Sequence, residues 1–173
     1  MIKNISNLGD AAIYCDFGSD VNEVINSNVT DYFNHITNLV KQEKIQGITN
    51  LTPSYNKLII SFDLSVIDFL KLKKIIENLD IKKHIKKNNQ KIKIPVCCDD
   101  EYGLDFERLS NKFNLSKDEI LDFFFDKEYF CYMTGFIAGM PFLGDLDKKI
   151  RINRLETPRV KVPEGSVGIT EQF

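Results

Sequence analysis

The chain has 173 residues, of which 43% are hydrophobic and 28% are charged, and these proportions are typical of a globular protein with one large or two small domains. A net charge of −2 argues against a general nucleic-acid-binding surface, and no apolar run is long enough to span a membrane. The N-terminus lacks a signal-peptide pattern, so we expect a cytoplasmic protein. Cys15, Cys97, Cys98 and Cys131 lack metal-ligand spacing, so we predict buried or half-buried free thiols and no metal site.

The chain begins with a strand pattern followed by a helix pattern. Residues 11–17 alternate well enough for a strand with one covered face. Apolar residues at three-four spacing then predict a long amphipathic helix over residues 21–44. Asp20 or Ser19 is the expected N-cap of this helix.

A hairpin and a second helix are predicted next. Residues 45–52 and 57–62 are strand candidates joined by a four-residue turn. The following helix should run over residues 66–79, with Ser65 or Asp63 as its cap.

A basic run over residues 82–93 separates the two halves of the sequence. We interpret it as a solvated connector, with a basic binding patch as the alternative. Residues 92–98 then form a strand candidate, which could close a ferredoxin-like unit in spite of Pro95. Residues 1–90 are therefore predicted to form an α+β domain with helices on one face of an antiparallel sheet.

An acidic turn opens the second half. Its Asp99 and Glu101 could act in acid–base chemistry or hold a metal, or they could favour the N-terminus of a helix predicted over residues 105–113. Ser116 and Glu119 form a Ser-x-x-Glu capping box for a further helix. The phenylalanines at 123–125 in that helix are predicted to be core residues.

A glycine-rich apolar loop follows a strand predicted over residues 129–136. Glycine permits unusual backbone conformations and close approach of a ligand, and proline fixes φ. The loop could be a buried turn between strands or the lining of a pocket. Its candidate binding residues are Gly135, Phe136, Gly139, Pro141 and Phe142.

Arg159 is the strongest single candidate for binding an anion. Its planar guanidinium could hold a carboxylate or phosphate with two hydrogen bonds, although an exposed surface arginine is an equal alternative. Ser166 and Lys161 are weaker candidates. No base is identifiable beside Ser166, so it is not predicted to be a nucleophile, and the catalytic residues stay unassigned.

Three collinear blocks carry a resemblance to a known family. They are Ile94-Pro-Val-Cys-Cys-Asp-Asp-Glu-Tyr-Gly103, Gly135-Phe-Ile-Ala-Gly-Met-Pro-Phe-Leu-Gly144 and Thr157-Pro-Arg-Val-Lys-Val-Pro-Glu-Gly-Ser-Val-Gly168. They resemble, in order, the patterns IPV-x-Y-(D/E)-x-EYG-x-D, GF-x-PGF-x-YLG and TPR-x-x-VP-x-GSVGI. The family includes the B subunit of 5-oxoprolinase, the KipI-type antikinase and allophanate hydrolase subunit 1. The chain departs from these patterns at Ala138 (usually proline), Met140 (aromatic) and Cys98 (often tyrosine).

The resemblance implies a fold with a ferredoxin-like N-terminal domain, followed from residue 91 to residue 173 by a cyclophilin-like β-barrel domain. The family normally continues past the third block, whereas this sequence ends at Phe173, so we expect an incomplete barrel. A fragment of a longer gene, a decayed copy and a short form completed by a partner would each explain this ending.

The resemblance also implies a function. The leading hypothesis is a subunit of an ATP-dependent 5-oxoprolinase that acts together with the A subunit and the KipA-like C subunit of that enzyme. ATP is its expected co-substrate, and the glycine loop and Arg159 are its expected binding residues. The alternatives, which the sequence leaves open, are an inhibitor of a sensor histidine kinase and an allophanate hydrolase or urea carboxylase-type subunit.

Overall fold

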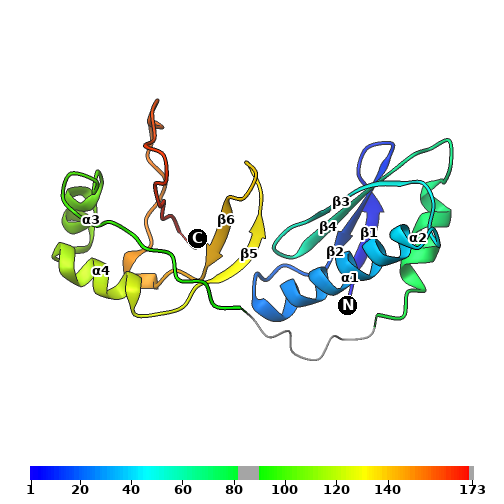
Figure 1. Ribbon diagram of the computed structural model, residues 1–173, viewed down its shortest axis with the longest axis horizontal. Coiled ribbons are helices and arrows are strands. Elements are labelled where there is room, and N and C mark those ends of the chain that lie inside the picture. Colours follow the sequence, from blue (N-terminus) through cyan, green and yellow to red (C-terminus); the bar gives the residue numbers. More distant parts are fainter. Residues whose placement is uncertain (82–89, 172–173) are drawn as a thin grey trace. The chain divides into compact units, whose positions relative to one another are not determined.

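The computed structural model describes residues 1–81 and 90–171, and the chain divides into two compact units, Met1–Asn89 and Gln90–Phe173 (Figure 1). The sequence analysis places its predicted domain boundary near residue 90 as well, and the identity of the two predicted domains stays a prediction. The predicted solvated connector lies mostly outside the described residues, since it covers residues 82–93.

The first unit is built on a four-stranded antiparallel sheet with the strand order β1-β2-β4-β3. Its strands are β1 (Asn4–Asn7), β2 (Ala12–Asp16), β3 (Ile48–Pro53) and β4 (Lys57–Phe62). In the central pair, Ile13 lies opposite Ile60 and Cys15 opposite Leu58. All four side chains are buried, because alternate residues of a strand point to the same face of the sheet.

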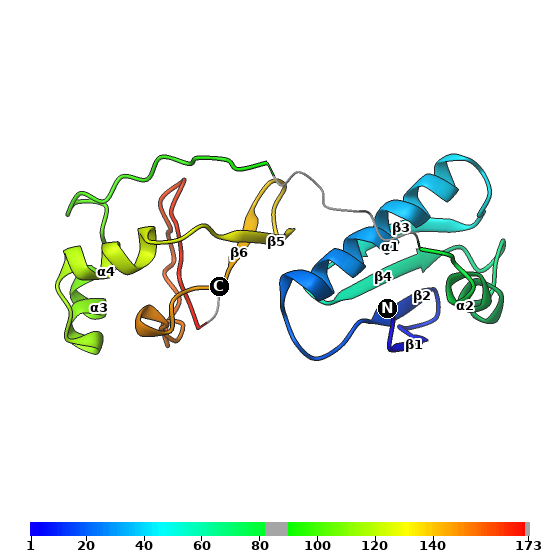
Figure 2. The same ribbon diagram turned by 90° about the horizontal axis from the view of Figure 1, so that it is seen from below.

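Helices α1 (Glu23–Lys41) and α2 (Phe69–Glu77) pack on that buried face (Figure 2). Val29 and Ile36 of α1 and Leu72 and Ile76 of α2 are buried against the strand residues. Residues four or seven positions apart lie on the same face of a helix, so each pair belongs to one apolar stripe. Phe62 of β4 also belongs to this core.

Both helices of this unit begin later than predicted. Asn22 caps α1, since its side-chain Oδ1 accepts a hydrogen bond from the Ile25 N–H at 2.9 Å. Asp68 caps α2 in the same way through the Lys71 N–H at 2.9 Å. The predicted cap Asp63 instead accepts hydrogen bonds from the Ser65 N–H and hydroxyl, so these two residues form a turn before the helix.

The strand predicted over residues 92–98 is wrong. These residues form no strand, and Ile92 and Ile94 are exposed. The sheet edge beside β2 is taken by β1, which folds back through a tight turn that includes Gly9 at φ +61°. The sequence pattern does not reveal this N-terminal hairpin, because β1 is only four residues long and mostly polar.

The second unit combines two helices, a β-hairpin and a short 3₁₀ helix. Its elements are α3 (Phe106–Phe113), α4 (Lys117–Phe125), β5 (Phe130–Thr134), β6 (Pro141–Gly144) and η1 (Lys148–Ile150). The predicted capping box of α4 is confirmed, because Ser116 Oγ accepts from the Glu119 N–H and the Glu119 carboxylate accepts from the Ser116 N–H. A small core joins Leu109, Ile120 and Ile150.

The phenylalanines of α4 are only partly core residues. Phe123 and Phe124 pack against the small core, as predicted, whereas the Phe125 side chain is 54% exposed. Successive helical residues are rotated about 100° from one another, so three in a row cannot all face one core. Among residues 1–81 and 90–171, no helix combines the length and apolar character that a membrane crossing requires.

Candidate functional site

The glycine loop links β5 to β6 and projects the side chain of Phe136 outward. The loop is closed by hydrogen bonds from the Gly135 N–H to the Met140 carbonyl at 3.1 Å and from the Met140 N–H to the Ile137 carbonyl at 3.2 Å. Phe136 has a φ of +66° and its side chain is 91% exposed. The loop is therefore not a buried turn.

Two of the candidate residues belong to a strand rather than to the loop. Pro141 and Phe142 lie in β6, where they pair with Thr134 and Met133 of β5. Proline lacks an N–H group, so a strand tolerates it best at an edge position, where the missing N–H would face away from the partner strand. The loop proper is thus residues 135–140, which is shorter than the sequence pattern suggests.

The loop presents backbone donors. The N–H groups of Phe136, Ala138 and Gly139 donate no hydrogen bond within the part of the chain that the structure describes. Phe136 and Gly139 both adopt positive φ, at +66° and +82°. Turns of this kind can turn successive N–H groups toward one point, an arrangement that suits an anion.

Arg159 makes a two-hydrogen-bond fork with Asp105, the residue that immediately precedes α3. Its Nη1 donates to Asp105 Oδ2 at 2.9 Å and its Nη2 donates to Asp105 Oδ1 at 2.7 Å. The two side chains are 34% and 36% exposed. The carboxylate stabilises the charged guanidinium, so the pKa of Arg159 is raised above its ordinary value. The carboxylate that Arg159 holds in this structure is that of Asp105.

Ser166 is engaged locally. Its hydroxyl donates to the Pro163 carbonyl at 2.7 Å and its N–H donates to the same oxygen at 3.3 Å, which closes a turn around Gly165. Ser166 therefore stabilises this turn. Lys161, two residues before Pro163, is exposed.

The acidic turn keeps Asp99 and Glu101 exposed. The paired acid of this segment is Asp100, whose carboxylate accepts a hydrogen bond from Lys117 Nζ, and this contact lowers the pKa of Asp100. Over the described residues, no group of three or more His, Cys, Asp or Glu side chains could hold a metal ion. Asp99 and Glu101 are therefore separate exposed carboxylates, and they belong to no metal-binding group among the described residues.

The cysteines are all free, as predicted, but their exposure differs from the prediction. Cys15 is buried, and burial raises the pKa of its thiol to about 12. Cys98 is half-buried, whereas Cys97 and Cys131 are exposed. The prediction of buried or half-buried thiols is therefore wrong for the last two.

The structure joins some candidates and leaves others apart. Arg159 is brought to α3 by Asp105, a residue that the sequence pattern marks only as the start of a helix. A signal for Asp105 exists, because it is the final acid of the EYG-x-D pattern. Within residues 90–171, Arg159 forms no hydrogen bond or ion pair with the glycine loop.

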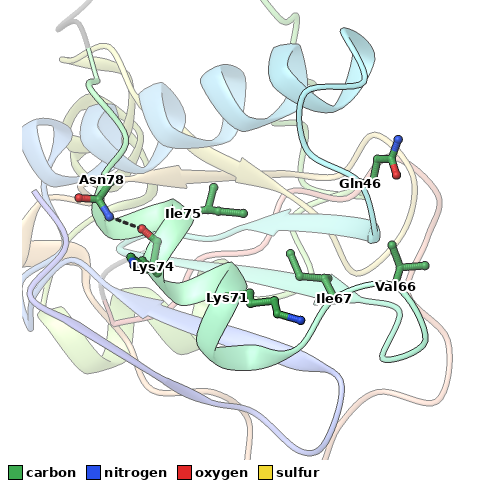
Figure 3. Close-up of a pocket in the computed structure, with 7 residues that line it drawn as sticks. All are labelled: Gln46, Val66, Ile67, Lys71, Lys74, Ile75 and Asn78. Atoms are coloured by element: carbon green, nitrogen blue, oxygen red, sulfur yellow. Dashed lines mark hydrogen bonds between the residues drawn. The ribbon is translucent and has the colours of Figure 1, made fainter.

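A surface pocket of about 630 Å³ lies in the first unit, beside α2 (Figure 3). Its lining residues come from α2, from the residue that follows α2, from the turn before α2 and from the segment before β3: Gln46, Val66, Ile67, Lys71, Lys74, Ile75 and Asn78. Lys71 pairs with Asp68 at 3.0 Å, and the Asn78 side-chain amide donates to the Lys74 carbonyl at 2.6 Å. No sequence motif points to this pocket, because its walls are about twenty residues apart in the chain.

Comparison with known proteins places the chain in a family. The family described as "Carboxyltransferase domain, subdomain C and D" matches residues 3–173. The chain is 30% identical over 177 residues to the B subunit of 5-oxoprolinase from Bacillus subtilis (strain 168), covering 95% of this chain and 72% of that protein. It is 33% identical over 125 residues to the B subunit of 5-oxoprolinase from Haemophilus influenzae, covering 72% of this chain and 58% of that protein.

A solved structure supports the fold. The crystal structure of TTHA0988 matches with a TM-score of 0.76 at 22% identity, covering 93% of this chain and 31% of that one. The match confirms a mixed α/β fold with antiparallel sheets. The three sequence blocks thus identify the correct group, and the chain belongs to the carboxyltransferase-domain family of subdomains C and D, which includes proteins named as the B subunit of 5-oxoprolinase.

Proposed function

We propose that this chain is a subunit of an ATP-dependent 5-oxoprolinase, an enzyme that opens the lactam of 5-oxoproline to glutamate. The relatives described above carry the name of the B subunit of that enzyme, and the chain spans 72% and 58% of their lengths. The observation that supports Arg159 as the candidate substrate-binding residue is its fork with Asp105. A guanidinium held in this geometry suits the carboxylate of 5-oxoproline.

Opening of the lactam needs one group that binds the substrate carboxylate and other groups that stabilise the phosphoryl oxygens. The lactam is an unactivated amide, so transfer of the γ-phosphoryl group from ATP to its oxygen would activate the ring carbon. Water then adds to that carbon, the C–N bond breaks with its electron pair going to nitrogen, and a second water releases phosphate from the acyl phosphate. Arg159 would hold the substrate carboxylate while backbone N–H groups stabilise the phosphoryl oxygens.

The loop at residues 135–140 is our candidate for those backbone donors. Phe136, Ala138 and Gly139 have N–H groups that donate no hydrogen bond in the described part of the chain. Two of these residues have positive φ, which turns their N–H groups in an unusual direction. The loop would meet Arg159 only in the assembled enzyme, where both could contact one substrate.

The proposal includes partners and a finer description of the fold. We infer that the chain acts with the C and A subunits of the enzyme, since a B subunit implies an assembly. We also infer that the first unit is ferredoxin-like, with β1 in the place of the fourth strand, and that the second unit is part of a cyclophilin-like barrel. The order β1-β2-β4-β3, with α1 after β2 and α2 after β4, supports the first of these inferences.

Co-purification followed by an activity assay tests the proposal. The chain is expressed with its A-type and C-type partner homologues, and the purified complex is assayed for ATP hydrolysis with and without 5-oxoproline. Hydrolysis should depend on all three chains and on 5-oxoproline. A complex that forms but hydrolyses no ATP in response to 5-oxoproline would contradict it.

A further inference from the structure

Cys97 and Cys98 are adjacent thiols that take no part in the proposed function. Both are free, Cys97 is exposed and Cys98 is half-buried. They lie between residue 90 and the acidic turn, in a segment that belongs to no helix or strand. An accessible thiol with a second thiol beside it can be oxidised to a reversible disulfide instead of to a higher oxide of sulfur.

Exposure assigns the two thiols different roles. The Cys97 thiol donates to Asp99 Oδ2 at 3.5 Å, and its exposure lets a dissolved oxidant reach it. Cys98 is half-buried and follows directly in the chain. A group that the chain itself holds beside the reacting atom acts at a high effective concentration. Cys97 is therefore the thiol that an oxidant meets first, and Cys98 is the thiol that can attack the oxidised sulfur.

The backbone around the pair can adjust to a ring. The peptide bond between the two residues is trans, so their Cα atoms are about 3.8 Å apart. Ordinary disulfides join Cα atoms about 4.4–6.8 Å apart, so closure of this ring requires a local change of the backbone. Within the described part of the chain, residues 92–98 form no backbone hydrogen bond that would resist this change. A strained disulfide is also reduced more readily, which makes the modification reversible.

We propose that Cys97 and Cys98 form a modification site that a hydroperoxide oxidises to a disulfide. The Cys97 sulfur attacks one oxygen of the hydroperoxide, the O–O bond breaks, and a sulfenic acid forms on Cys97 while water or an alcohol leaves. The Cys98 sulfur then attacks the Cys97 sulfur, the S–S bond forms, and the hydroxyl group leaves as water with the Cys98 proton. The thiol pair is oxidised by two electrons and the hydroperoxide is reduced. This inference does not depend on the proposed function.

The acidic turn is the part of the fold that closure of the ring would affect. The turn begins at Asp99, whose carbonyl accepts a hydrogen bond from the Tyr102 N–H at 3.0 Å. A disulfide sulfur has no proton to donate, so oxidation removes the contact between Cys97 and the Asp99 carboxylate. The turn leads into Asp105, the partner of Arg159. Oxidation of the pair therefore acts on the segment that carries Asp105.

Mass spectrometry of the oxidised chain tests the modification. Hydrogen peroxide is added to the reduced chain, the remaining thiols are blocked with N-ethylmaleimide, and the tryptic peptide of residues 94–108 is measured, since its only cysteines are Cys97 and Cys98. This peptide should escape blocking and lose two hydrogen atoms, and dithiothreitol should restore both thiols. A peptide that keeps both thiols, gains oxygen atoms or is linked to another peptide would overturn the site.

Two serine variants provide a matched comparison. Cys98→Ser removes the attacking thiol, so its peptide should carry a sulfenic acid on Cys97 and should not lose two hydrogen atoms. Cys131→Ser removes an exposed thiol that has no cysteine next to it in the sequence, so the yield of the oxidised peptide should stay unchanged. Equal yields of the oxidised peptide from the two variants would overturn the proposal.

Amide hydrogen exchange tests the effect on the acidic turn. Exchange at Tyr102 should be faster by about threefold or more in the oxidised chain, because the change of backbone weakens the hydrogen bond that protects its N–H. Leu58, which is buried in β4 of the first unit, is the control and should exchange at an unchanged rate. Unchanged exchange at Tyr102 in a chain that has formed the disulfide would overturn the link between the thiol pair and the turn.

Discussion

The guanidinium of Arg159 and the carboxylate of Asp105 are joined by two hydrogen bonds of 2.9 and 2.7 Å, although the two residues are 54 positions apart. Asp105 makes no side-chain cap bond to α3, so its carboxylate is committed to Arg159. In this pair, the Arg159 guanidinium donates two hydrogen bonds to one carboxylate. It also means that a substrate carboxylate would have to replace Asp105.

Replacement of the Asp105 carboxylate by the substrate carboxylate predicts different effects of substitutions at Arg159 and Asp105 in the assembled enzyme. Arg159→Lys should lower kcat/KM for 5-oxoproline by about tenfold or more, because lysine cannot reproduce the fork. Asp105→Asn keeps the guanidinium and removes the competing charge, so KM for 5-oxoproline should stay equal or fall. Steady-state kinetics of both variants, with assembly of the complex checked by gel filtration, measures this. Equal losses in the two variants would show that Arg159 acts only by tying its own segment of the chain to Asp105.

Asn26 predicts a large stability effect inside the first unit. Its buried side-chain amide donates to the Tyr55 carbonyl at 2.9 Å and to the Ser54 carbonyl at 3.3 Å, which ties α1 to the turn between β3 and β4. Asn26→Ala should lower the free energy of unfolding by about 1–3 kcal/mol, since it removes these bonds. Asn38→Ala, at an exposed position of the same helix, should change it by less than about 0.5 kcal/mol. Urea denaturation followed by circular dichroism compares the two. Similar effects at both positions would contradict this role of Asn26.

Local patterns in the sequence predict the parts of the fold that depend on neighbouring residues. Strand Lys57–Phe62 and the capping box of Ser116 and Glu119 agree with the prediction, because alternation and i, i+3 spacing are visible along the chain. The caps Asn22 and Asp68 differ from the prediction, because several acceptors stand close together and the packing of the helix selects one of them.

Long-range relationships are not predictable from one sequence. The edge position beside β2 is decided by the pairing of β1, which has little apolar pattern of its own. For the site, the guanidinium chemistry of Arg159 and the EYG-x-D pattern single out Arg159 and Asp105 separately, but nothing along the chain shows that these two residues form a pair. The exposure of Phe136 is also hidden, because an apolar loop residue is ordinarily expected to be covered.

Cys15 predicts a loss of stability at alkaline pH. Burial raises the pKa of its thiol from 9.0 to about 12, so above pH 9 the unfolded chain loses this proton while the folded chain keeps it. The free energy of unfolding should therefore fall as pH rises through this range, by at most about 1.4 kcal/mol per pH unit from this group. Cys15→Ala should flatten the pH dependence of the free energy of unfolding across this range. Denaturant titrations across this range measure the slopes, and identical slopes for wild type and Cys15→Ala would contradict the assignment.

The glycine loop predicts different responses at two adjacent positions. Gly139 has a φ of +82° with open space where a Cβ would lie, so Gly139→Ala should cost about 1–2 kcal/mol from backbone strain alone. Ala138→Pro should be neutral or stabilise by up to about 1 kcal/mol, because the Ala138 N–H donates no hydrogen bond in the described residues. Thermal unfolding of the two variants tests this pair. A large loss of stability in Ala138→Pro would show that the loop backbone at this position does not fit proline.

The central claim is that the chain works as a 5-oxoprolinase subunit through Arg159. Its most direct test is the rate of ATP hydrolysis by the purified complex of this chain with its A-type and C-type partner homologues, measured with and without 5-oxoproline and with glutamate quantified as the product. We expect 5-oxoproline-dependent ATP hydrolysis with matching glutamate formation, and loss of this activity in the complex that carries Arg159→Lys. An intact complex that forms no glutamate from 5-oxoproline, or one that retains full activity with Arg159→Lys, would contradict it.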